Sequence, residues 1–144
     1  PTDQKNKVSN VFSTLYGAAH KYNGNMDYFT NMTDDTKGAG LVNPYLSLNY
    51  KLSDKSSMVA DFHYFRLQNN YIVASKTIDK GLGQEIDLSF SHTFSKEVSL
   101  LAGVSALQGT ESLSYLKGGN YHKIATWAFA MLTVKPTFFE SGGK

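Results

Sequence analysis

The chain has 144 residues, of which 41% are hydrophobic, 13% aromatic and 18% charged, and its net charge is +2. This length fits one domain, residues 1–144, and the aromatic content excludes an intrinsically disordered chain. The sequence contains no Cys, which excludes disulfide scaffolds, thiolate metal sites and Cys nucleophiles. It has no cluster of Lys and Arg, so we expect no nucleic-acid partner. No apolar stretch reaches the roughly 18 residues of a transmembrane helix.

The N-terminal third has the weakest pattern. The chain begins with Pro1 rather than Met, so we expect it to be processed or to be part of a longer protein. Residues 1–10 are polar, and we expect them to be frayed. Residues 11–29 are rich in aromatic residues and Gly but have no clear period, and we expect one strand within them. A long connection is expected over residues 30–41.

From residue 46 onward, apolar and polar residues alternate. Leu46, Leu48 and Tyr50 share one face of the predicted strand, and Ser47 and Asn49 share the other. This period is typical of a strand with one apolar and one polar side. The last predicted strand is apolar on both faces, which leaves its orientation ambiguous. The predicted strands cover residues 46–52, 58–64, 84–94, 98–106 and 125–139.

The connections between these strands alternate in length. The turns at 53–57 and 95–97 are short, whereas the connections at 68–83 and 107–124 are long. Outer-membrane barrels have this order, with short periplasmic turns and longer extracellular loops. About six strands are too few for a single-chain barrel, which needs at least about eight. We therefore predict an all-β fold: the C-terminal portion of an antiparallel up-and-down transmembrane β-barrel, completed by the remaining strands of the parent barrel or by neighbouring chains.

The stretch 15–29 contains His20, Gly24 and Asp27 at the spacing of a His-x-x-x-Gly-x-x-Asp signature. In this it resembles the alginate-export-type porins of the bacterial outer membrane. Residues 83–88 and 131–139 are similar to the last strands of that family. The resemblance implies a many-stranded barrel in contact with membrane lipid. It also implies a diffusion or export channel for a carbohydrate or another small polar solute.

The polar face of the predicted strands supplies the candidate pore lining. A pore for a polyanion is expected to be rich in Arg and Lys, but this face combines Lys51 with Asp61, Glu85 and Asp87. These acidic residues could instead form a carboxylate pair for hydrolysis, although their positions on the polar side of strands favour the lining. The lining candidates are Ser47, Asn49, Lys51, Asp61, His63, Glu85, Asp87, Ser89 and Ser91.

No pattern of residues predicts a catalytic or metal site. No nucleophile and base can be paired by spacing, so we expect neither an enzyme nor a cofactor. The sequence has 4 His residues, which lack the close spacing of metal ligands, so we expect no metal. Some aromatic residues could either stack on sugar rings or belong to the aromatic girdle of a membrane barrel. They are Tyr28, Phe29, Tyr64, Phe65 and Trp127.

Three functions remain open from the sequence. The first is an outer-membrane porin that passively passes a small polar or carbohydrate solute. The alternative is a soluble, lipocalin-like barrel whose apolar face points inward around an apolar ligand. A third is a structural subunit whose strands complete a barrel with neighbouring chains. If the first is correct, one set of residues should be exposed on the outside: Leu46, Leu48, Phe62, Ile86, Leu88 and Phe90.

Overall fold

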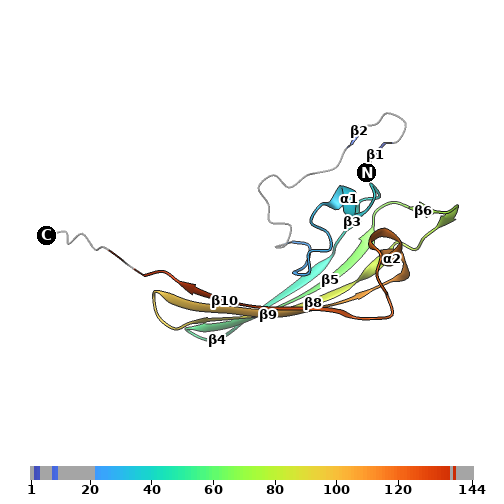
Figure 1. The fold of residues 1–144 in the computed structure, drawn as a ribbon. Helices are drawn as coiled ribbons and strands as arrows, with labels where there is room; N and C mark the ends of the chain where they lie inside the picture. The colour runs from blue at the N-terminus through green and yellow to red at the C-terminus, as the bar shows by residue number, and fades with distance from the viewer. Residues whose placement is uncertain (1, 4–7, 10–21, 137, 139–144) are drawn as a thin grey trace.

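The computed structural model of the chain describes residues 2–3, 8–9, 22–136 and 138 (Figure 1). These residues form mainly antiparallel β-structure, with two short helices. The elements are β1 (Thr2–Asp3), β2 (Val8–Ser9), α1 (Met32–Asp35), β3 (Leu41–Val42), β4 (Tyr45–Ser53), β5 (Ser56–Leu67), β6 (Ile72–Val73), β7 (Lys76–Thr77), β8 (Gly81–Thr93), β9 (Val98–Gly109), α2 (Glu111–Lys117) and β10 (Ala125–Val134).

The main sheet is six-stranded and follows the order of the chain. Its path is β10-β9-β8-β5-β3, and β4 also pairs with β5. The short strand β3 opposes Arg66 and Leu67 near the end of β5, and β4 opposes the part of β5 from Ser56 to His63. Both strands therefore lie along one edge of the sheet. Every pair is antiparallel, which confirms the predicted up-and-down order of the long strands. In the described part of the chain the sheet stays open, with β10 at the opposite edge.

The two ends of the sheet differ in the length of their connections, as the sequence predicts. Figure 1 shows the β4–β5 and β8–β9 turns at one end, and α1, α2 and β6 at the other. At the turn end, the Ser95 hydroxyl accepts hydrogen bonds from the backbone N–H groups of Glu97 and Val98, at 3.2 Å each. The Lys51 ammonium lies 2.6 Å from the Asp54 carboxylate beside the other turn. Side chains therefore fix both tight turns.

The long connections contain structure that the sequence pattern does not predict. The β6–β7 hairpin lies in the connection between β5 and β8. Helix α2 lies between β9 and β10, where the Thr110 side chain caps it by accepting a hydrogen bond from the Leu113 N–H. Leu113 and Leu116, one helical turn apart, are its buried apolar side chains.

Two predictions about the ends of the chain differ from the structure. A third, one strand within residues 11–29, stays a prediction, because residues 22–29 form turns and 11–21 lie outside the described residues. The last strand ends at Val134 rather than at residue 139, because Pro136 has no N–H for a ladder hydrogen bond. In the N-terminal stretch expected to be frayed, β1 pairs with β2.

The register sorts the side chains onto two faces of a curved sheet. One cross-strand row on the convex face reads Leu48, Ala60, Leu88, Val104 and Ala128. Leu48 is 60% exposed and Leu88 is 40% exposed, so no element in the described chain covers this face. The residues predicted to lie on the outside share this face: Leu46, Leu48, Phe62, Ile86 and Leu88 are exposed, and Phe90 is half-buried.

The buried core lies on the other face, at the end with the long connections. Phe29 and Phe65 are fully buried, and their ring centroids lie 4.7 Å apart. Neither ring belongs to a membrane girdle or is available to a sugar, which corrects both alternatives proposed for them. Their burial follows from residues 22–40, which lie over the concave side of the sheet (Figure 1). The core residues are Phe29, Ala39, Phe65, Leu67, Ile78, Leu82, Leu107, Leu113 and Leu116.

Candidate functional site

All the predicted lining residues lie on the concave face. The register places Ser47, Asp61 and Asp87 in one cross-strand row, and His63 opposite Glu85 in the next row. On β5 and β8 their exposure falls from the turn end towards the end with the long connections, whereas the residues of the edge strand β4 are all exposed. Ser47, Asn49 and Lys51 are exposed, Asp61, Ser89 and Ser91 are half-buried, and His63, Glu85 and Asp87 are buried.

The buried residues lie on one face together with half-buried Asp61 and buried Ser105. We call these five residues the carboxyl cluster: Asp61, His63, Glu85, Asp87 and Ser105. Glu85 and Asp87 are two residues apart on β8, so their side chains share a face. They are 0% and 1% exposed. The imidazole Nε2 of His63 lies 3.7 Å from Oδ2 of Asp87. Burying polar groups this deeply costs free energy unless they form hydrogen bonds, so their hydrogen-bond partners indicate the role of the cluster.

Residues 22–40, which we call the covering segment, supply two of those partners. The backbone N–H of Met26 donates a hydrogen bond to Oε1 of Glu85 (2.8 Å). The backbone N–H of Asn25 donates to Oδ2 of Asp87 (3.2 Å). The chain reaches the carboxyl groups this closely at Gly24, where a Cβ would lie 2.5 Å from Oε1 of Glu85. Gly24 also has φ +82°, a conformation that favours Gly.

A second set of contacts fixes the imidazole of His63. Its Nδ1 lies 3.2 Å from Oδ1 of Asn43, whose amide nitrogen donates a hydrogen bond to the carbonyl of Tyr22 (2.8 Å). The ring stacks between Tyr45 (5.4 Å between centroids) and Phe65 (5.6 Å). Asn43 therefore links the covering segment to the cluster through a side chain, in addition to the two backbone contacts.

The two carboxyl groups lie on the same face of β8, two residues apart. Oε2 of Glu85 and Oδ1 of Asp87 are buried and have no hydrogen-bond partner among the described residues. A proton shared between the two groups would let one donate to the other, whereas two carboxylates can only accept. The Ser105 hydroxyl, in the same row as Asp87, is likewise buried without a hydrogen-bond partner among the described residues.

This arrangement holds a segment of chain in place. The carboxyl oxygens accept hydrogen bonds from backbone N–H groups of the covering segment. The cluster therefore acts as an anchor for the covering segment on the concave face. Among residues 22–136, no group of three or more His, Asp or Glu side chains is arranged to hold a metal ion.

The orientation of β10, which the sequence leaves ambiguous, is set by its register with β9. Trp127 opposes Ser105 and Phe129 opposes Gly103, so both aromatic rings lie on the concave face. A Cβ on Gly103 would lie 2.4 Å from the Phe129 ring, so Gly103 makes room for it. The two rings stack with centroids 4.9 Å apart. The concave face is thus polar along β4, β5 and β8 and aromatic along β10.

The sequence pattern does not predict that the covering segment is anchored on the sheet. A signal was present, because Asn23-Gly24-Asn25 is a turn-forming tripeptide next to a dense aromatic stretch. Its docking partner is about 60 residues away in the chain, so no local pattern could pair the two.

Comparison of the chain with models of protein families, with curated proteins and with solved structures gives no match. Among the described residues, no helix has the length and apolar character to cross a membrane.

Proposed function

We propose that the chain is part of an outer-membrane β-barrel that forms a passive channel for a small polar or carbohydrate solute. One observation carries this proposal: the up-and-down sheet leaves an apolar face exposed on its convex side and buries polar groups on its concave side. Soluble proteins rarely expose so large an apolar patch, and a lipid environment explains it. A lipocalin-like barrel would have its apolar face on the concave side, which argues against that alternative.

The dimensions of the convex face support contact with lipid. Its apolar rows lie between the row of Gln84 and the row of His92, and within them the described strands carry no charged side chain. These eight residue intervals correspond to about 27 Å along the strand, at ~3.4 Å each. With a strand tilt of about 40°, the band is roughly 20 Å high, near the ~25 Å of outer-membrane barrels.

Polar groups flank the band at both limits. At the turn end, His92 Nδ1 lies 2.7 Å from the Ser56 hydroxyl, so the imidazole is paired where the band ends. At the other end, Tyr64 lies opposite Gln84, and Tyr is typical of the interface between membrane and water. The β10 and β4 edges also need partners in lipid, which the rest of a parent barrel or neighbouring chains would supply.

The behaviour of the full chain with lipid tests this proposal. Because the convex face is apolar, we expect the chain to need detergent to stay in solution and to float with phosphatidylcholine vesicles in a density gradient. The measurement is vesicle flotation together with the β-sheet signal in circular dichroism. A chain that stays folded and monomeric without detergent, and that does not float, would contradict the membrane proposal and favour the soluble alternative.

The charge of the concave face gives a second prediction. Asp61 is the half-buried acidic residue of the carboxyl cluster, whereas Glu85 and Asp87 are covered. A charge beside a narrow, low-dielectric channel focuses the field, so Asp61→Asn should shift the ion preference of the channel towards anions. Reversal potentials in planar bilayers measure this. Glu97→Gln, in the β8–β9 turn, is the matched control, and an equal shift in both variants would remove Asp61 from the pore lining.

A further inference from the structure

A cavity of about 230 Å³ lies on the concave face between the covering segment and the connection from α2 to β10. Its floor includes Leu107 and Ala125, which are opposite each other in the register. Tyr28 and Tyr121 also line it, one from the covering segment and one from the connection. Ligand sites of drug size are ~300–1,000 Å³, so this cavity is suited to one small ring. Its polar lining comes from Thr110, Ser114, Gly118, Gly119, Asn120 and Lys123.

The wall formed by residues 118–124 is held in place before any ligand binds. The Gln108 amide donates a hydrogen bond to the carbonyl of Tyr121 (2.7 Å). The backbone N–H of His122 donates to the Asn120 side chain (3.0 Å), and the N–H of Lys123 donates to the Asn120 carbonyl (3.1 Å). A preformed wall reduces the entropy that binding would otherwise cost.

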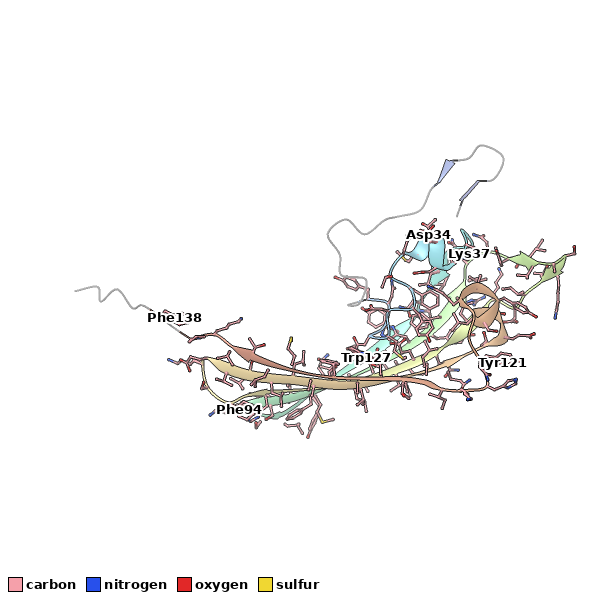
Figure 2. All side chains as sticks on the ribbon, in the orientation of Figure 1. Asp34, Lys37, Phe94, Tyr121, Trp127 and Phe138 are labelled. Atoms are coloured by element: carbon pink, nitrogen blue, oxygen red, sulfur yellow. The ribbon has the colours of Figure 1, made fainter. Side chains whose placement is uncertain are left out.

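Trp127 extends the aromatic lining beyond the cavity. It lies two residues after Ala125 on β10 and therefore on the same face, about 7 Å further along the strand. Phe129 stacks against the indole, with the two ring centroids 4.9 Å apart. Trp127 is 40% exposed, and Figure 2 shows it on the side of the sheet that carries the covering segment.

We infer that this cavity is a binding site for a neutral sugar, with Trp127 beside it as a reporter. Apolar faces of a sugar ring stack on Tyr rings, while hydroxyl, amide and backbone groups at the cavity wall match sugar hydroxyl groups. Among the described residues that line the cavity, Lys123 is the one charged side chain, and it is exposed, so its attraction for an anion is small. This assignment names the solute of the proposed channel and rests on that proposal for its biological role.

The single Trp of the sequence provides the readout. Titration of the full chain in detergent with cellobiose, a neutral disaccharide, should change the Trp127 fluorescence until saturation, whereas glycerol should cause only a linear drift. Tyr121→Ala should weaken cellobiose binding by about tenfold or more, because it removes one stacking wall. Tyr115→Ala is the matched control, since Tyr115 is exposed on α2 and does not line the cavity.

Three results would overturn the assignment: a response to cellobiose no different from that to glycerol, equal weakening in both Tyr variants, or saturation by galacturonate but not by cellobiose. Vesicle flotation, measured on the same samples, keeps this test separate from the test of the channel. Binding without flotation would refute the membrane proposal alone, and flotation without binding would refute the sugar site alone.

Discussion

Replacing Leu88 by Arg is expected to stop the chain from assembling in a membrane, whereas the same replacement at its neighbour Ser89 is expected to be tolerated. The two residues are adjacent on β8 and therefore lie on opposite faces. Leu88 is exposed near the middle of the convex apolar band, where an Arg in lipid costs about 2–4 kcal/mol. Ser89 is half-buried on the polar concave face.

This pair of variants separates the effect of lipid from the effect of size and charge. Both add the same side chain to the same strand, so only the environment of the position differs. The measurement is the folded fraction in phosphatidylcholine vesicles, read from the difference in gel mobility between heated and unheated samples. Equal loss in the two variants, or greater loss for Ser89→Arg, would contradict the proposal that lipid contacts the convex face.

Replacing Gly24 by Ala is expected to release the covering segment from the carboxyl cluster. The added Cβ would lie 2.5 Å from Oε1 of Glu85, so that carboxyl group must move and give up its hydrogen bond from Met26. A hydrogen bond to an uncharged group contributes about 0.5–1.5 kcal/mol, and the positive φ adds about 1–2 kcal/mol for Ala. The summed loss is about 1.5–3.5 kcal/mol of folded-state stability, which thermal unfolding in detergent would measure.

A matched control for this variant is available in the same chain. Gly118 has φ +78° and ψ −167°, a backbone conformation that also favours Gly, but a Cβ there would have nothing within 4 Å. Gly118→Ala should therefore show a backbone cost without displacing a neighbouring side chain. Because the chain has no Cys, Ser105→Cys adds a single thiol in the buried row beside Asp87. Its maleimide labelling should be faster in Gly24→Ala than in Gly118→Ala, and equal rates would mean that the segment does not depend on Gly24.

The sheet could be predicted from the sequence to a large extent because its signal is local. Alternation places Leu88 and Ser89 on opposite faces without any knowledge of their neighbours, and the short turns fix which strands pair. The orientation of β10 could not be predicted, since Trp127 and Ala128 are both apolar and only the register with β9 separates them.

The candidate site could be predicted only as a set of residues on one face. Glu85 and Asp87 were correctly placed on the polar side of a strand, but their burial depends on Asn25 and Met26, which follow no period. Phe29 and Phe65 were assigned to the surface for the same reason. Contacts between segments far apart in the chain decide burial, and a single sequence does not contain them.

The hydrogen bonds from Asn25 and Met26 to β8 also set an order of events during folding. The covering segment precedes the main sheet in the chain, but the carboxyl groups that anchor it are in place only after the later strands β5, β8 and β9 have paired. It must therefore wait through the closure of a loop of about 60 residues, and contacts of such long range form late. Until then the carboxyl groups stay hydrated, so docking of the covering segment is the step that expels water from around Glu85 and Asp87.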